Sequence, residues 1–131
     1  MTWHGFYEGI PIPQGSKTAM VVNGRAVMFE ANKKHKSYRA GLEEWFADAS
    51  PTLNPVRVEL VFYFVRPKTV KREHPRVKPD IDKLCRTVLD AATGHLFKDD
   101  SQVVVLNARK EYADQPGVLV RCFEIDKITI R

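Results

Sequence analysis

The chain has 131 residues, a length that accommodates one domain with a sizeable hydrophobic core. Hydrophobic residues make up 44% and charged residues 28%, a balance that excludes a disordered or low-complexity chain. Lysine and arginine outnumber aspartate and glutamate by 21 to 16, so the net charge is +5 and an acidic partner is favoured.

The sequence also restricts where the protein works. No segment approaches the ~20 apolar residues of a membrane span, and the N-terminus lacks the pattern of a signal peptide. Cys85 and Cys122 lie in apolar runs without zinc-like spacing, which predicts reduced core residues. We therefore expect a cytoplasmic protein with no membrane partner.

The first part of the chain is predicted to contain strands and then a helix. A strand is expected around Trp3–Glu8, and Ala19–Glu30 is expected to form a hairpin because Asn23-Gly24 favours a tight turn. Apolar residues then recur at helical spacing from Tyr38 to Ala49, which predicts the first helix, with Asn32 or Ser37 as the candidate cap at its start.

The second part is expected to alternate strands with one further helix. Val56–Val65 alternates with apolar residues on both sides, which predicts a central strand. The apolar stripe within Asp80–Thr93 predicts an amphipathic helix, and two strands follow at Gln102–Glu111 and Val118–Ile125. The predicted order is β-β-β-α-β-α-β-β, an α+β fold in which residues 1–131 form one domain, with two main helices packed on a mixed sheet.

A basic, proline-rich loop separates the central strand from the second helix, and we expect it to be exposed and poorly ordered. Its best candidates for phosphate contact are Lys71, Arg72, Arg76 and Lys78. A second candidate DNA-binding surface consists of Lys17, Arg25, Lys33, Lys34 and Lys36. For any one of these side chains, an ordinary solvated role is an equally good interpretation.

Five aspartates follow this loop: Asp80, Asp82, Asp90, Asp99 and Asp100. Acids repel phosphate, so their place beside a basic loop is best explained if they hold divalent cations. Mg²⁺ prefers oxygen ligands, and two such ions about 4 Å apart activate water and stabilise a leaving oxygen in phosphodiester hydrolysis. Asp80 and Asp82 converge only if Asp80 is still extended, which Pro79 favours.

Each of these residues also has a structural interpretation. Asp80 is a plausible helix N-cap, and Asp82 is a favourable first-turn acid. Arg86 stands one turn after Asp82, where it would hold that carboxylate or clamp a phosphate. Asp90 shares a face with Arg86 and is expected to pair with it, while Asp99-Asp100 is a common turn sequence.

The segment Lys78–Val104, KPDIDKLCRTVLDAATGHLFKDDSQVV, resembles the core motif of the RusA-type Holliday junction resolvases, small phage- and prophage-borne endonucleases. The stretches GIPIPQGSKTAM and GRAVMFEANKKHKSYR are similar to that family's opening. The resemblance implies a RusA-like fold and a homodimer in the bacterial host cytoplasm. It also implies Mg²⁺ dependence, with Mn²⁺ able to substitute and no small-molecule cofactor. Such an enzyme resolves four-way DNA junctions by symmetric paired nicks, using metal-activated water.

The resemblance assigns the catalytic, metal-binding acids to Asp80, Asp82 and Asp100. A helix lysine of the family falls on Arg86, which keeps the charge but not the compact ammonium, and an asparagine is replaced by Lys83. We expect Asp100 to return to the helix start through an extended Gly94–Asp99 segment, with supply from a second subunit as the alternative. A less selective nuclease for branched DNA and a DNA-binding protein without catalysis remain alternative functions.

Overall fold

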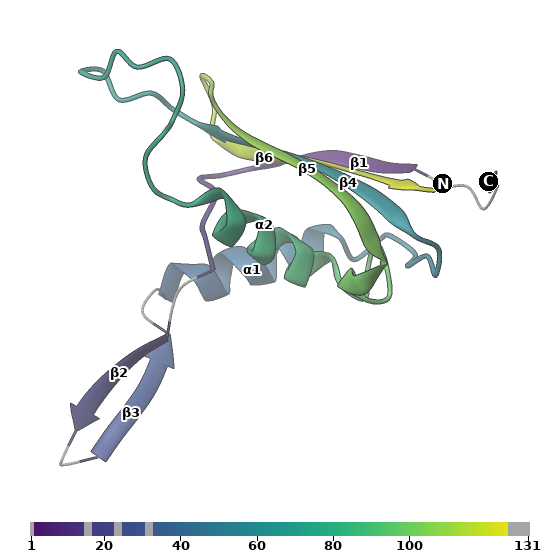
Figure 1. Cartoon of the computed structure of the whole chain (residues 1–131), viewed down its shortest axis with the longest axis horizontal. Helices are drawn as coiled ribbons and strands as arrows, with labels where there is room; N and C mark the ends of the chain where they lie inside the picture. The colour runs from purple at the N-terminus through teal and green to yellow at the C-terminus, as the bar shows by residue number, and fades with distance from the viewer. Residues whose placement is uncertain (1, 15–16, 23–24, 31–32, 126–131) are drawn as a thin grey trace.

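The computed structural model describes residues 2–14, 17–22, 25–30 and 33–125. Along these ranges the chain forms, in order, β1 (Thr2–Glu8), β2 (Lys17–Val22), β3 (Arg25–Glu30), α1 (Lys33–Trp45), β4 (Val56–Phe64), α2 (Ile81–Ala92), the short 3₁₀ helix η1 (Asp100–Gln102), β5 (Val103–Tyr112) and β6 (Gly117–Glu124). The predicted order of elements and the α+β class are confirmed (Figure 1). β2 and β3 pair as the expected hairpin, whose Asn23-Gly24 turn lies outside the described residues.

The main sheet has four strands in the order β1-β6-β4-β5. β6 runs antiparallel to both β1 and β4, whereas β5 runs parallel to β4. β4 thus has a neighbour on each side, as its apolar faces predicted. Because β4 and β5 are parallel and α2 connects them, the carboxyl ends of both strands lie at the same edge of the sheet. In α/β connections of this kind, ligands bind beyond the carboxyl ends of the strands.

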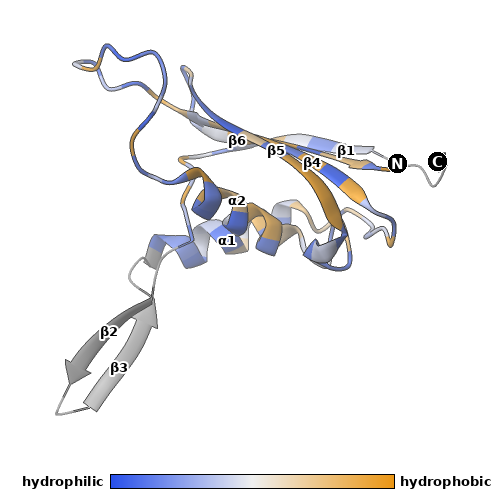
Figure 2. Cartoon of the chain, in the orientation of Figure 1, coloured by the Kyte–Doolittle hydropathy of each residue, from blue (hydrophilic) through white to orange (hydrophobic). Residues whose placement is uncertain are grey.

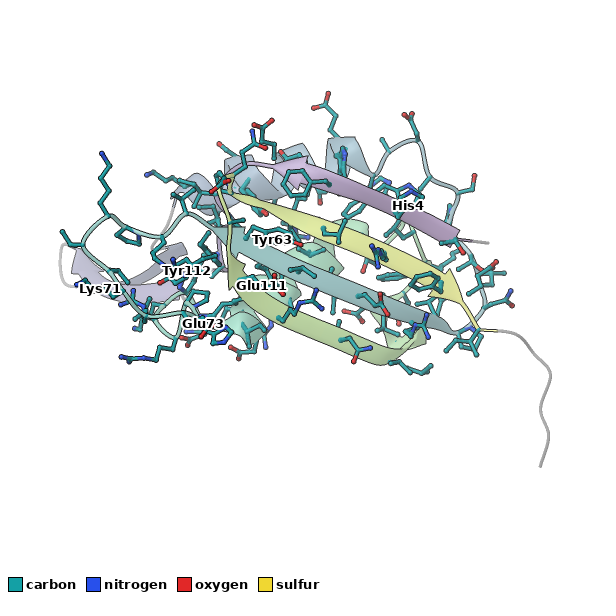
Figure 3. The ribbon with its side chains drawn as sticks, turned by 90° about the horizontal axis from the view of Figure 1, so that it is seen from above. His4, Tyr63, Lys71, Glu73, Glu111 and Tyr112 are labelled. Atoms are coloured by element: carbon teal, nitrogen blue, oxygen red, sulfur yellow. The ribbon has the colours of Figure 1, made fainter. Side chains whose placement is uncertain are left out.

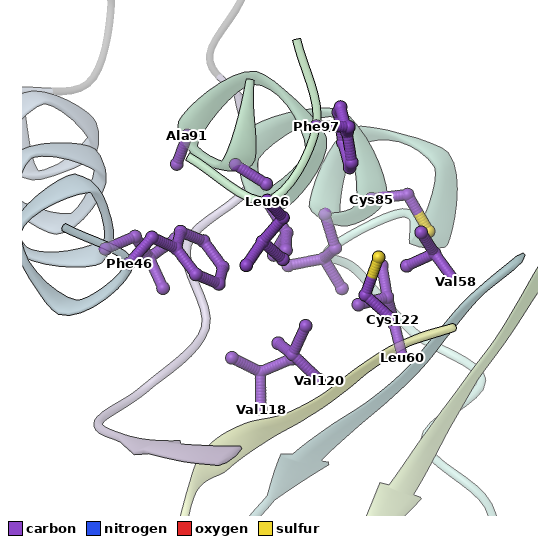
Figure 4. Packing of buried hydrophobic residues seen from close by; sticks show 14 of the residues in the cluster. Phe46, Val58, Leu60, Cys85, Ala91, Leu96, Phe97, Val118, Val120 and Cys122 are labelled. Carbon is purple, nitrogen blue, oxygen red and sulfur yellow. The ribbon is translucent and has the colours of Figure 1, made fainter. Parts of the chain in front are cut away.

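Both helices cover one face of the sheet, and the core lies between the two layers (Figures 1 and 4). The core cluster comprises Leu42, Phe46, Val56, Val58, Leu60, Phe62, Leu84, Cys85, Val88, Ala91, Ala92, Leu96, Phe97, Val118, Val120 and Cys122. Both cysteines are buried and free, as predicted. Burial of this apolar surface is what fixes α2 against the sheet and leaves its opposite side to solvent.

α2 begins and ends close to the predicted residues. Asp80 occupies the N-cap position in extended conformation, and Thr93 is the C-cap. Gly94 follows with φ +87°, a conformation that glycine adopts without strain, and its amide donates to the carbonyl of Phe97. The polypeptide therefore turns sharply away from the helix axis at this point.

α1 begins where one of the two predicted starts places it and ends earlier than predicted. It begins at Lys33, which agrees with a start after position 32 and not with one after Ser37, although its first turn carries no apolar stripe. It ends at Trp45, and Phe46 continues into a turn in which its amide still donates to the carbonyl of Leu42. Phe46 is fully buried even though it lies beyond the helix, so the apolar pattern extended further than the helix. Among the described residues, no helix is long and apolar enough to cross a membrane.

The face of the sheet opposite the helices carries polar and aromatic side chains, among them His4, Tyr63 and Glu111 (Figure 3). Glu59 pairs there with Arg57 at 3.6 Å and with Arg121 at 3.8 Å. One acid on this face is thus shared between two arginines.

Candidate active site

The basic loop between β4 and α2 is attached to β5, contrary to the expected poorly ordered excursion. Arg72 Nε donates to the hydroxyl of Tyr112 at 2.9 Å, and the guanidinium of Arg66 lies 4.9 Å from the Tyr112 ring centroid. Lys110 Nζ donates to the carbonyl of Pro79 at 2.8 Å. Figure 3 shows Lys71 on this loop beyond the end of the sheet. Tyr112 and Lys110 of β5 thus hold the loop, together with its cations, in a defined place.

An open cleft of about 900 Å³ lies between this loop and the start of α2, at the carboxyl end of β5. Its lining includes His74, Arg76, Lys78, Asp80, Asp82 and Lys110. Arg76 and Lys78 are exposed, so two of the predicted phosphate contacts border the two predicted metal-binding acids. The sequence prediction that basic loop and acids form one site agrees with this lining.

Asp80 stands at the N-cap position, yet its side chain makes no capping hydrogen bond. Its backbone is extended, with φ −71° and ψ 139°, as expected from the sequence. The pre-proline restriction itself acts on Lys78, the residue before Pro79. The carboxylate is 51% exposed, and its charged neighbour is Lys83 Nζ at 3.9 Å. Asp80 is therefore the N-cap residue by position, as expected, but its carboxylate is not used to satisfy the helix.

A second cavity, of about 490 Å³, runs between the outer side of α2 and β5. Asp82, Arg86, Asp90 and Asp100 all line it. Arg86 forms no ion pair within the described ranges, and Asp90 instead approaches Arg39 of α1 at 3.9 Å. The expected pairing of Arg86 with Asp90 is therefore wrong, and the Arg86 guanidinium is available to a ligand.

The Gly94–Asp99 segment is a folded turn, so the extended return to the helix start does not occur. The amide of Leu96 donates to the carbonyl of Ala92, and Lys98 N donates to the carbonyl of Thr52. Figure 1 shows this turn at the end of the molecule opposite the basic loop. α2 itself is about 18 Å long at 1.5 Å per residue. Asp80 and Asp100 thus lie near opposite ends of α2.

The position of Asp100 is further fixed by its two neighbours. The hydroxyl and the amide of Ser101 donate to the Asp99 carboxylate and lower the pKa of Asp99 below its usual range. The side-chain amide of Gln102 donates through Nε2 to the carbonyls of Thr52 and Asn54, each at 2.9 Å. Asp99 and Gln102 serve to cap and anchor the turn, which leaves Asp100 as the acid of the pair that lines the cavity.

One chain does not assemble a three-acid metal site. Among the described residues there is no group of three or more His, Cys, Asp or Glu side chains placed to hold a metal ion. Mg²⁺ nevertheless needs only one or two carboxylates, completed by waters and substrate phosphate oxygens. Asp80 and Asp82 fit that requirement, because both line the same cleft. The Asp80 side chain also makes no capping hydrogen bond that would compete with a metal ion.

The second predicted basic surface is only partly described. Lys34 and Lys36 are exposed in the first turn of α1, while the side chains of Lys17, Arg25 and Lys33 lie outside the described residues. The amide of Gln14 donates to the carbonyl of Lys83 at 3.1 Å. This bond attaches the segment before β2 to the first turn of α2. Lys17, three residues later in the chain, therefore starts its strand within about 10 Å of Gln14.

One residue that lines the cleft, Lys110, is not predicted from the sequence as a site residue. It lies opposite the fully buried Phe62 in the β4–β5 register, so both side chains are on the helix-facing side of the sheet. The alternation of side chains along β5 was the available signal for this placement.

Together, these features define an α+β domain with two exposed carboxylates in a basic cleft, as expected of an enzyme that acts on nucleic acid. The family model for endodeoxyribonuclease RusA matches residues 8–122. A protein of Bacillus subtilis (strain 168) described as uncharacterized protein YqaN is 31% identical over 89% of this chain and 92% of its own length. The chain belongs to the RusA endodeoxyribonuclease family. Membership implies an endonuclease of the Holliday junction resolvase type, with a branched-DNA substrate, in a family whose nucleases generally use Mg²⁺.

Proposed function

We propose that this chain is a Mg²⁺-dependent crossover junction endodeoxyribonuclease, which resolves four-way junctions by symmetric paired nicks. The observation that carries the proposal is the state of Asp80: a carboxylate at a helix start that does not cap the helix and lines a basic cleft together with Asp82. An acid in that place would weaken DNA binding unless a cation intervened. Family membership supports the proposed reaction, and the residues that line this cleft support its proposed location.

The residues divide the work by their chemistry. Asp80 and Asp82 would hold Mg²⁺, or Mn²⁺ in its place, and the bound ion supplies an activated water and charge neutralisation. Arg86, with no ion pair among the described residues, is suited to clamp a phosphate in bidentate fashion. Exposed Lys71, Arg76 and Lys78 would bind flanking phosphates and so fix the position of the strand.

We further propose that a second copy completes the site through β5. This strand ends the sheet order, and it exposes Val104, Val105 and Leu106 at 61%, 40% and 42%. Figure 2 shows this part of β5 as a hydrophobic stretch. An unpaired apolar edge is a template for strand pairing. Two copies related by a two-fold axis would pair their β5 strands in antiparallel fashion and extend both sheets into one.

Such pairing brings the separated acids together. A two-fold axis near Val105 sets the partner's Asp100 opposite residues close to Lys110 of the first copy. Lys110 contacts Pro79, the residue before Asp80. The axis is perpendicular to the joined sheet, so the helices of both copies stay on the same face. Each cleft would then receive Asp80 and Asp82 from one copy and Asp100 from the other, and two such sites explain symmetric nicking.

The test of catalysis is Asp80→Asn. The variant should lose nicking of a four-way junction and retain or tighten junction binding without divalent metal, because a negative charge near phosphate is removed. Persisting nicking would refute the proposed site, and so would nicking by the wild type that does not require divalent metal. Wild-type rates on four-way, three-way and linear duplex DNA test the substrate. Equal rates on all three would replace the junction resolvase with a less selective nuclease.

A further inference from the structure

Lys110 has an unusual position for a lysine near the active-site cleft. It lies near the end of β5, beside Phe62, and its side chain is half-buried. Its Nζ donates to two backbone carbonyls of the basic loop, that of Val77 at 2.7 Å and that of Pro79 at 2.8 Å. An ammonium has three donors, and these two bonds leave one directed to the surroundings of the cleft that Lys110 lines.

The two carbonyls belong to the segment that leads into Asp80. Pro79 has no amide proton, so it cannot anchor itself to the sheet as a donor. Asp80 is bound on its other side by α2, where the amide of Leu84 donates to its carbonyl. In the described part of the chain, Lys110 is the side chain that ties this segment to β5. The orientation of the extended Asp80 residue thus depends on a contact from a strand about 30 residues later in sequence.

We propose that Lys110 is a positioning residue for Asp80, a role that rests on the proposed function. By binding the Val77 and Pro79 carbonyls, it holds the Asp80 carboxylate toward Asp82 in the geometry that a divalent ion requires. Residues that orient the ligands of a metal typically change metal affinity or activity by about 10- to 100-fold when removed. Lys83 differs, because it contacts the Asp80 carboxylate directly from the exposed surface of α2.

The experiment compares Lys110→Met, Lys110→Gln and Lys110→Arg with the matched control Lys68→Met, which removes an exposed ammonium from the same loop. Three quantities are measured for each: the single-turnover nicking rate at saturating four-way junction, the Mn²⁺ dissociation constant from electron paramagnetic resonance without DNA, and junction affinity without divalent metal. Thermal unfolding confirms that each variant is folded.

Lys110→Met should lower the nicking rate and weaken Mn²⁺ binding, each by about 10- to 100-fold, with no greater loss of junction affinity than Lys68→Met. Lys110→Gln, which can donate to one carbonyl at a time, should fall between. Lys110→Arg should recover most of both properties, because a guanidinium can reach two carbonyls. If Lys110→Met does not fold, the ordering of Gln and Arg variants decides the matter.

An unchanged Mn²⁺ dissociation constant in Lys110→Met would overturn the positioning role. If Lys110→Met does not fold, the same result in Lys110→Gln would overturn it. So would a loss confined to junction affinity, which would make Lys110 an ordinary phosphate contact. The proposed function fails in a different way, through a wild-type chain that does not nick junctions. In that case the Mn²⁺ titration still reports whether Lys110 positions Asp80.

Discussion

The sharing of acids between two copies can be tested by mixing two inactive variants. Asp80→Asn and Asp100→Asn would each inactivate both sites of their own homodimers. In a mixed dimer, one site is intact. It takes Asp80 and Asp82 from the Asp100→Asn copy and Asp100 from the Asp80→Asn copy. The second site then carries both substitutions. Activity should therefore return on mixing, although neither variant nicks alone.

The expected magnitude follows from the separation of the acids. α2 spans about 18 Å, whereas Mg²⁺–oxygen distances are about 2.1 Å, so no side-chain rotation joins Asp80 to Asp100 within one chain. At equal amounts, random exchange makes about half of the dimers mixed, each with one of two sites intact. Nicking should recover to about one quarter of the wild-type rate. Because only one site works, the products should be single nicks rather than paired ones.

A supercoiled plasmid with an extruded cruciform distinguishes these products, since single nicks give open circles and paired nicks across the junction give linear molecules. The matched control mixes Asp80→Asn with Asp82→Asn. These substitutions fall in the same half of the site, so every site in that mixture is defective and no activity should return. Mixed dimers of Asp80→Asn and Asp100→Asn that form but do not nick would refute the sharing of acids.

Three further predictions concern single residues. Lys83→Asn should lower the Mg²⁺ concentration for half-maximal nicking by up to about twofold, since an exposed pair at this spacing is worth about 0.2–0.5 kcal/mol; a higher requirement would show that Lys83 assists Asp80. Phe97→Ala should lower the free energy of unfolding by about 3–5 kcal/mol in urea titrations, because Phe97 is fully buried, and a loss below 1 kcal/mol would contradict the described core. Burial raises the pKa of Cys85 and Cys122 to about 11, so both thiols should react with a disulfide reagent at pH 8 only on unfolding. Rapid labelling of the native protein would contradict this. The stability that the two protonated thiols contribute should be lost as pH rises from about 9 through 11.

Much of the fold could be read from local patterns. The alternation in Val56–Val65 identified the central strand because both of its faces are buried or half-buried around Val58, Leu60 and Val61. The stripe of α2 was equally clear because one side of the helix packs on the sheet. The start of α1 was left open between Asn32 and Ser37, because its first turn is polar and periodicity reports only the residues that a helix buries.

The site was predictable in composition but not in geometry. Asp80 was expected to be extended before the helix, which the structure confirms. The Gly94–Asp99 turn could not be predicted, because its shape depends on hydrogen bonds to Thr52, which is about 40 residues earlier. The partner of Asp90 was mistaken for the same reason: Arg39 belongs to a helix that only tertiary packing brings close. Spacing in sequence orders residues along one helix but does not reveal contacts from other elements.

α2 packs on the sheet through one side, with Asp80 before its start and Asp100 beyond its end. In the proposed dimer, the acids at its start serve one site, and Asp100 near its end serves the other. Each copy therefore contributes to both sites, and neither site is complete until both copies are present. Dissociation of the two copies would remove an acid from both sites at once, so a single copy would make no isolated cut.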